Sequence, residues 1–193
     1  MFNLLKYKSD DLFEKVNTAK GITELSIWCP EYNLEKQGQH FLNFKKLKSL
    51  FLQSHVNSKY LIPNDVGELK SLKKLGVLNF NYDQFPEWIL NLSNLEYLMF
   101  RGSDIKNLPE SIHKLTNLKY FRLENCSIKK LPESMFNMGK LVHLSLIDNF
   151  NIESIDSNCL PRNLRKLTVT PSNLSSKQKE MISNSRPKLK VIK

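Results

Sequence analysis

The chain has 193 residues, of which 40% are hydrophobic and 25% are charged, and its net charge is +10. This composition is too apolar for a disordered protein, and the length suits one domain with a substantial core. The first ten residues contain no apolar run long enough for a signal-peptide core, and no later stretch approaches the roughly eighteen apolar residues of a membrane span. The sequence therefore predicts a soluble chain without membrane contact, which is cytoplasmic unless a leader has been removed.

The cysteine content argues against disulfides and metal sites. Cys29, Cys126 and Cys159 are odd in number, and no two of them are closely spaced. A disulfide framework needs paired cysteines, and a zinc site needs ligands at short regular spacing. We therefore expect reduced thiols, no bound metal and no other cofactor.

The chain opens with a predicted cap helix. Residues 10–19 follow Ser9 and repeat apolar side chains at helical spacing, and Gly21 suits the C-terminal end of such a helix. The end of a repeat domain needs a segment that shields its core from water. Residues 1–21 are therefore predicted to form an N-terminal cap.

From residue 22 to residue 171 the sequence repeats itself seven times. Each unit contains the pattern L-x-x-L-x-L, whose latter part alternates apolar and other residues as a short strand with one buried face does. The first two steps between units are 25 residues long, and the other four are 23 residues long. The first positions of the pattern are Ile22, Leu47, Leu72, Leu95, Leu118, Leu141 and Leu164.

A second motif recurs in phase with the first and predicts a helical turn. It has the form apolar-Pro-x-x-apolar and starts at Ile62, Phe85, Leu108 and Leu131, again 23 residues apart. Proline suits the first position of a helical turn because its missing N–H is not needed there, and a following acid suits the dipole of the turn. Each turn is followed by an apolar residue that closes the coil, namely Leu69, Leu92, Leu115 and Met138.

The last segment, residues 172–193, is predicted to be a C-terminal cap. Residues 175–184 suggest a helix, and a truncated repeat follows in which Leu189 and Ile192 take the first and fourth positions of the strand pattern. The whole chain, residues 1–193, is therefore expected to be one repeat domain.

These motifs resemble the leucine-rich-repeat family, in its 23-residue class, over roughly residues 22 to 192. The resemblance implies an α/β solenoid that is curved, with a parallel β-sheet on its concave face and short helical turns on its convex face. The first, fourth and sixth residues of each strand pattern should then face a continuous core. We accordingly expect Leu98, Leu123 and Leu144 to be almost fully buried.

One position of the family carries an Asn or Cys whose side chain bonds the loop backbone. Ser103, Cys126 and Asn149 fill it acceptably in this chain. His55 and Phe80 occupy it in the earlier repeats, so the N-terminal third should be less regular.

No catalytic constellation is visible. His40, His55, His113 and His143 lie in no nucleophile elbow and no H-E-x-x-H motif. His143 is placed to face the groove, where we favour a contact residue over a general base because no partner acid is evident. For Cys126 the family's loop-bonding role is favoured over a reactive thiol. The chain is therefore predicted not to be an enzyme.

The expected groove carries many large side chains. The third, fifth, seventh and eighth residues of each strand pattern should face it, and aromatic, Met and Arg side chains are enriched at interface centres. The candidate contact residues are Trp28, Phe51, Leu78, Tyr97, Met99, Arg101, Tyr120, Arg122, His143 and Ile147. They predict a protein-binding module acting as a scaffold, inhibitor, sensor or immunity-type protein that occludes a toxin's active site. Packing of this stripe against a terminal segment or a second copy of the chain is the alternative.

The positive charge leaves a second function open. Lysines cluster before two neighbouring strands and should form a basic edge. Solvated lysines are the simplest interpretation, an acidic protein partner is the next, and a nucleic acid is the third. The edge residues are Lys45, Lys46 and Lys48, with Lys70, Lys73 and Lys74 one repeat later.

Overall fold

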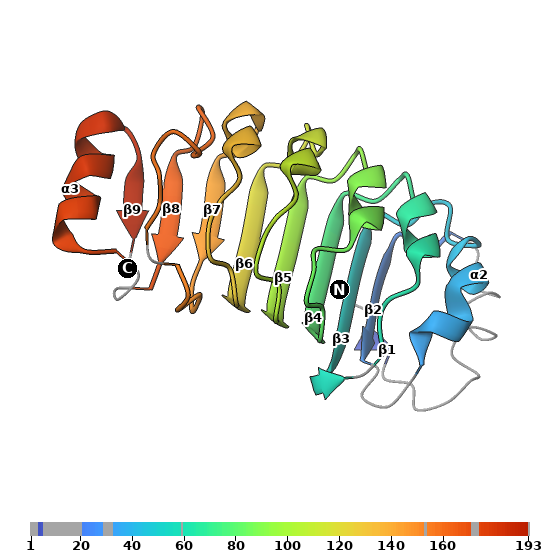
Figure 1. Cartoon of the computed structure of the whole chain (residues 1–193). Helices are drawn as coiled ribbons and strands as arrows, with labels where there is room; N and C mark the ends of the chain where they lie inside the picture. The colour runs from blue at the N-terminus through green and yellow to red at the C-terminus, as the bar shows by residue number, and fades with distance from the viewer. Residues whose placement is uncertain are drawn as a thin grey trace.

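A computed structural model describes residues 4–5, 21–28, 33–58, 60–152, 154–170 and 174–192. Within these residues the chain forms one sheet of nine parallel strands, β1 to β9, which lie side by side in chain order. Figure 1 shows them as a single row from one end of the molecule to the other. This order confirms the predicted α/β solenoid. The predicted cap helix over residues 10–19 lies outside the described residues.

The seven strands from β2 to β8 each begin at the third position of the strand pattern, as the repeat predicts. A short strand, β1, pairs with β2 and was not predicted. The strands are β1 Leu4–Leu5, β2 Glu24–Trp28, β3 Ser49–Ser58, β4 Lys74–Phe80, β5 Tyr97–Ser103, β6 Tyr120–Cys126, β7 His143–Leu146, β8 Lys166–Val169 and β9 Lys190–Ile192.

The last strand differs from its prediction by one residue. Val191, rather than Ile192, pairs with Leu167 at the fourth position of the pattern. The physical reason is that helix α3, Ser176–Ser185, replaces the short turn of the other repeats and returns the chain by a path of different length. The guanidinium of Arg186 ties this path down by donating to the carbonyls of Leu160 and Pro161 at 2.6 and 3.1 Å.

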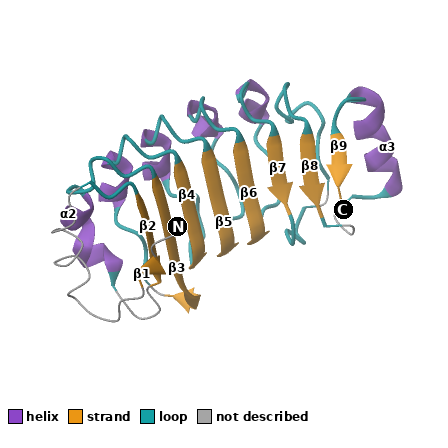
Figure 2. Ribbon diagram, turned by 180° about the vertical axis from the view of Figure 1, so that it is seen from behind, coloured by secondary structure: helices purple, strands orange, loops and turns teal. Residues whose placement is uncertain are grey.

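Short helical turns connect the strands. In Figure 2 the strands face the viewer and the turns lie behind and above them. Proline precedes each regular turn and is its N-cap rather than its first helical residue, so our placement was wrong by one position. The proline carbonyl accepts the first bond of the turn, as Pro86 does from Ile89 at 3.2 Å. The elements are η1 Leu34–Gln37, α2 Gly38–Phe41, η2 Asn64–Glu68, η3 Glu87–Asn91, η4 Glu110–Lys114 and η5 Glu133–Asn137.

The core runs without a break between the sheet and the turns. Leu98, Leu123 and Leu144 are 0% exposed, which confirms the predicted core positions. The turns add buried apolar residues, such as Trp88 and Ile89 from η3 and Ile112 from η4. No repeat could bury these side chains alone, because each needs the neighbouring repeat as its cover.

Residues with a left-handed backbone conformation recur at the eighth position of the strand pattern. Asn79, Gly102, Asn125 and Asp148 all have φ between 48° and 70°. Gly, Asn and Asp tolerate this conformation best, so their recurrence every 23 residues has a backbone cause. The pattern is present in the sequence, but we did not predict it.

The loop-bonding position behaves as the resemblance implies at two of its three predicted residues. The Ser103 hydroxyl donates to Phe80 O at 2.6 Å, and the Asn149 amide donates to Leu123 O at 2.6 Å, so each joins two repeats. The Cys126 thiol instead donates within its own repeat, to Glu124 O at 3.4 Å. These bonds satisfy backbone groups that would otherwise be buried without partners.

Candidate functional site

The candidate site is the strand face. We define it as the surface formed by the third, fifth and seventh positions of the strand pattern in the seven repeats that contain β2 to β8. Side chains at these positions point away from the core, which takes the fourth and sixth residues. The open sheet in Figure 2 is this surface.

The register of the sheet brings the central candidates together. Tyr97 on β5 pairs with Tyr120 on β6, and Met99 pairs with Arg122, which pairs in turn with Ser145 on β7. Neighbouring strands lie about 4.8 Å apart, so these side chains are direct neighbours. Tyr120 is 45% exposed, which makes it an open aromatic surface in the middle of the strand face.

Phe51 joins this group through an unpredicted contact. It lies on β3, two strands from Tyr97, yet their ring centroids are 6.2 Å apart. The ring of Phe51 fills the space above Gly76, because a Cβ at Gly76 would clash with it. A glycine on the intervening strand therefore lets two aromatic rings meet across it, which the sequence signalled only through Gly76 itself.

Met99 lies below this surface. We had expected it to be an exposed contact residue, and it is buried instead. It is 9% exposed, and its sulfur accepts a bond from the Tyr97 hydroxyl at 3.6 Å. Its neighbour on β4 is Gly76, over which the Phe51 ring lies. Met99 is therefore covered in part by Tyr97, and it lies beside the Gly76 position that the Phe51 ring covers.

Arg122 is held by a carboxylate on its own strand. Its Nε lies 2.8 Å from Oε1 of Glu124, whose side chain is 9% exposed, and the Ser145 hydroxyl donates to the same oxygen at 2.9 Å. The hydrogen bond that Arg122 donates to Glu124 raises the pKa of Arg122, so the guanidinium stays charged. A cation fixed in this way keeps its orientation before any partner arrives, which lowers the entropy lost on binding.

His143 lies at the edge of the same group. Its ring centroid is 6.4 Å from that of Tyr120, and its Nε2 is 3.1 Å from the Thr168 hydroxyl. Burial, followed by the positive charges of Lys166 and Arg122, lowers the pKa of His143. The imidazole is therefore neutral at neutral pH and serves as a polar surface with an aromatic face.

The other candidates lie apart from this group. Trp28 on β2 contacts His55, at 5.8 Å between ring centroids, and is three strands from Tyr97. Leu78 and Arg101 pair with each other at the seventh position of β4 and β5, and Ile147 follows β7. We name Phe51, Tyr97, Met99, Tyr120, Arg122 and His143 the central cluster.

The predicted basic edge is partly neutralised. The Glu96 carboxylate bonds Lys73 at 3.0 Å and Lys119 at 2.7 Å. The hydrogen bond from Lys119 is the larger cause and that from Lys73 the next, and together they lower the pKa of the Glu96 carboxyl to about 2. Lys70 lies 3.5 Å from Glu68. An acid therefore interrupts the row of lysines where a long polyanion would have to pass.

The described cysteines and acidic groups bear on two kinds of chemistry, reactive thiols and metal binding. Burial raises the pKa of the Cys126 thiol to about 11 and also raises that of Cys159, so neither thiol ionises readily. Cys29 lies outside the described residues. In the part of the chain that the structure describes, no three His, Cys, Asp or Glu side chains form a metal-binding group. None of its helices is long and apolar enough to cross a membrane.

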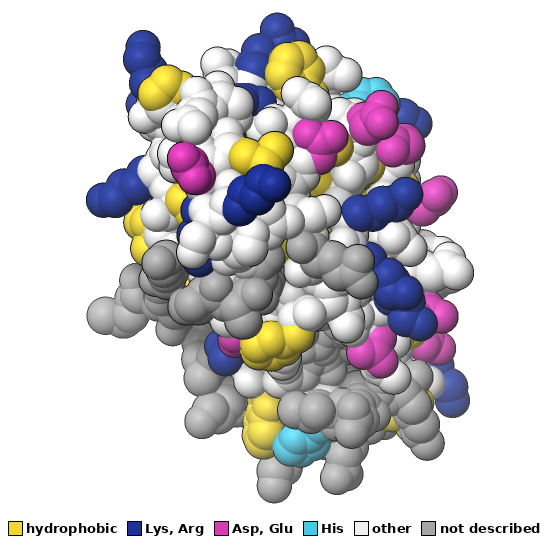
Figure 3. Space-filling view, turned by 60° about the vertical axis from the view of Figure 1, so that its left-hand side comes forward, with side chains coloured by type: hydrophobic (Ala, Val, Ile, Leu, Met, Phe, Trp, Pro, Cys, Tyr) yellow, Lys and Arg dark blue, Asp and Glu magenta, His cyan; other side chains and the backbone are white. Residues whose placement is uncertain are grey.

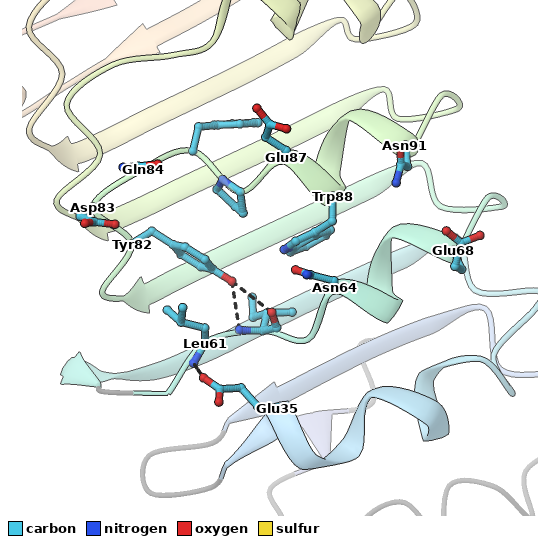
Figure 4. A pocket seen from close by; sticks show the side chains of 13 residues that line it. Glu35, Leu61, Asn64, Glu68, Tyr82, Asp83, Gln84, Glu87, Trp88 and Asn91 are labelled. Atoms are coloured by element: carbon cyan, nitrogen blue, oxygen red, sulfur yellow. Dashed lines mark hydrogen bonds between the residues drawn. The ribbon is translucent and has the colours of Figure 1, made fainter.

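A cavity of about 820 Å³ lies between η2 and η3 and contains several acidic side chains (Figure 4). Its polar atoms join neighbouring repeats. The Tyr82 hydroxyl accepts a bond from Ile62 N at 3.0 Å, and the Glu35 carboxylate accepts one from Leu61 N at 2.9 Å. Burial raises the pKa of Tyr82 to about 12. We assign these groups to holding the loops together.

Comparison with known proteins agrees with the fold. A family model described as a leucine-rich repeat region matches residues 23–193. A leucine-rich repeat protein of Leptospira interrogans has a similar structure, with a TM-score of 0.64 at 20% sequence identity. The match covers 92% of this chain and 50% of that one, so the chain spans half the length of that protein. At this identity the similarity shows the fold alone. No curated protein sequence matches the chain.

Proposed function

Because the chain belongs to the leucine-rich repeat region family, which suggests a protein-interaction module, we propose that it is a non-enzymatic module that binds another protein on its strand face. The observation that carries this proposal is the central cluster. It joins exposed aromatic surface to a cation that Glu124 already holds in place. Well-packed aromatic and Arg side chains supply most of the free energy at interface centres.

The charges of the strand face favour an acidic partner. Lys74 and Lys166 lie at its third positions, and Arg101 is exposed at a seventh position. Of the two acids on the strand face, Glu124 is buried and paired with Arg122, and Glu24 is exposed on β2, two strands from Lys74, so the positive charge is uncompensated on the side of β4 to β8. Carboxylates of a partner would meet uncompensated positive charge here, which speeds association and orients the two proteins.

Within this proposal the chain acts in the cytoplasm as a scaffold, inhibitor or sensor. One specific form is an immunity-type protein that covers the active site of a toxin. The strand face suits this role because a rigid sheet can exclude water from a convex partner surface without rearranging.

The test begins with capture of partners from a native lysate by the wild-type chain, followed by titration of the purified partner against variants. Tyr97→Ala and Arg122→Ala should each weaken binding by about thirtyfold, or about 2 kcal/mol. Glu110→Ala and His113→Ala on the outer turn should change it by less than about twofold. Equal losses from both pairs, or a loss only after changes at Lys45 to Lys48, would contradict the proposal.

Self-association through the strand face is the competing explanation for the central cluster. Sedimentation of the purified chain distinguishes the two, since the proposal predicts that the isolated chain is a monomer. A dimer that Tyr97→Ala converts into a monomer would assign the strand face to a second copy of the chain.

A further inference from the structure

A second surface of the molecule also has the character of a binding site. A cavity of about 790 Å³ lies at the edge of the sheet where the later strands begin, which is the top of Figure 1. It is formed by the segments that precede β6 to β9, so residues from four successive repeats converge on it. Its charged lining residues are Lys119, Lys140, Arg162, Arg165 and Lys188.

The positive charge of this cavity is largely uncompensated. No Asp or Glu is among its lining residues, and of its five cations Lys119 alone forms an ion pair with a described residue, Glu96. Lys140 donates to the Asn117 side chain at 2.6 Å, which positions its ammonium without neutralising it. In Figure 3 dark blue side chains lie at the top of the molecule and along both of its sides, and most magenta ones lie toward the right. An anionic ligand would therefore supply the negative charge that these cations lack.

The cavity also has apolar surface. Val142 and Leu164 line it between the cations. The guanidinium of Arg162 lies 5.6 Å from the ring centroid of Phe136, a side chain that is 41% exposed. Stacking on an aromatic ring holds a guanidinium in place while leaving its N–H donors available. A ligand with both carboxylates and an apolar side chain matches this lining better than a purely ionic one.

The residues beside the cavity disfavour a long nucleic acid. Glu96 bonds Lys73 and Lys119 together and so ends the basic row on the N-terminal side of the cavity. Nucleic-acid binding gains its affinity from many phosphate contacts along a continuous basic track. A short acidic segment needs only the local group of cations.

We propose that this basic cavity, Lys119, Lys140, Arg162, Arg165 and Lys188 around Val142 and Leu164, is a second binding site that takes an acidic peptide segment containing an apolar residue. It goes beyond the function proposed for the strand face and does not depend on it. The two sites are nevertheless neighbours, because Lys119 precedes Tyr120 in the chain and Arg165 precedes Lys166. One protein partner can therefore reach both, with a folded surface on the strand face and a flanking acidic segment in the cavity.

The experiment measures binding of a short fluorescent peptide of Glu, Asp and one Leu by anisotropy at two salt concentrations. Arg162→Gln/Arg165→Gln should weaken binding about tenfold, as loss of two charge-assisted contacts does. Lys45→Gln/Lys46→Gln removes the same charge from the basic edge at the N-terminal repeats and should alter binding by less than about twofold. Tyr97→Ala should also leave it unchanged, so failure of the strand-face proposal would not affect this result. Circular dichroism checks that each variant is folded.

Two comparison ligands complete the experiment. A peptide with Gln and Asn in place of Glu and Asp should not bind, and an oligothymidylate of equal net charge should bind more weakly than the acidic peptide. Lack of saturable binding by the acidic peptide would overturn the proposal. Equal losses from the two double variants, or tighter binding of the oligothymidylate through Arg162 and Arg165, would overturn it as well.

Discussion

The central repeats, residues 72–170, and the N-terminal repeats, residues 22–71, build the same sheet by different means. In the central repeats, side chains of one repeat donate to the backbone of the preceding repeat, as Ser103 does to Phe80 O and Asn149 to Leu123 O. The left-handed residues Asn79, Gly102, Asn125 and Asp148 accompany these bonds at a constant step.

The N-terminal repeats replace this regularity with bulky side chains. Their step is 25 residues, and β3 extends to ten residues with a shift in its pairing to β4 between Gln53 and Ser58. Phe41 and Phe44 pack edge to face, with 6.4 Å between their ring centroids. The comparison teaches that the central repeats are joined by loop bonds that recur with the repeat, whereas the N-terminal repeats combine aromatic packing with bonds particular to them, such as that from Leu61 N to the Glu35 carboxylate.

The largest expected effect tests whether both regions share one core. Leu123 and its N-terminal counterpart Leu52 are each 0% exposed at the sixth position. Leu123→Ala and Leu52→Ala should each lower the free energy of unfolding by about 2–5 kcal/mol, because each leaves a cavity. Urea unfolding followed by circular dichroism measures both losses. A loss below about 1 kcal/mol for either variant would contradict the shared core.

A smaller effect tests the left-handed row of the central repeats. Gly102 has a φ of 70°, and a Cβ there would lie 2.5 Å from Oδ1 of Asn79. Gly102→Ala should therefore lower the free energy of unfolding by about 1–3 kcal/mol. Gly139, which has open space around it and no positive φ, is the matched control, and Gly139→Ala should change stability by less than about 0.5 kcal/mol. Equal losses in urea unfolding would remove the backbone explanation of the row.

The next prediction concerns the carboxylate that holds Arg122. Glu124→Gln leaves the shape of the side chain but removes its charge, so it should cost about 1 kcal/mol of stability and release the guanidinium. Gln53→Ala at the same strand position of the N-terminal repeats should have a smaller effect, because Gln53 is exposed. Thermal unfolding compares the two variants. A Glu124→Gln protein as stable as the wild type would show that the ion pair does not hold the strand face together.

The smallest effect is the pH dependence of His143, whose pKa is lowered from 6.5 by burial, Lys166 and Arg122. The unfolded chain then takes up this proton more readily than the folded chain. The stability contributed by neutral His143 is therefore present above pH 6.5 and is lost as the pH falls through the lowered pKa. The NMR titration of its ring proton should have a midpoint below 6.5, and Lys166→Gln should raise that midpoint. A midpoint above 6.5 would contradict the assigned environment.

The sequence predicted the fold well because the repeat period carries the register. The spacing of Leu95, Leu118 and Leu141 puts Tyr97, Tyr120 and His143 at the same position of successive strand patterns, and the structure pairs Tyr97 with Tyr120 and Tyr120 with His143. It failed at the C-terminal strand, where helix α3 changes the length of the return path. Period alone cannot show such a change, because helix α3 replaces the turn motif by which the other repeats are aligned.

The candidate site was less predictable because its contacts cross strands. A strand position tells which face a side chain takes, but not that Phe51 leans over Gly76 or that Met99 is covered. The basic cavity depends on residues from four repeats and on the absence of acids between them. The sequence instead drew attention to the denser lysines near residue 45, and Glu96 neutralises part of that edge.

Hydroxyl-radical footprinting of the chain with and without its captured partner tests the central claim most directly. Tyr120 is 45% exposed on the strand face, whereas Phe150 and Met181, 69% and 62% exposed, lie outside it and act as internal references. The account predicts that partner binding lowers the oxidation rate of Tyr120 by about tenfold, as burial in an interface centre should, and leaves Phe150 and Met181 unchanged. Unchanged oxidation of Tyr120, with protection of Phe150 or Met181, would contradict the strand face as the binding surface.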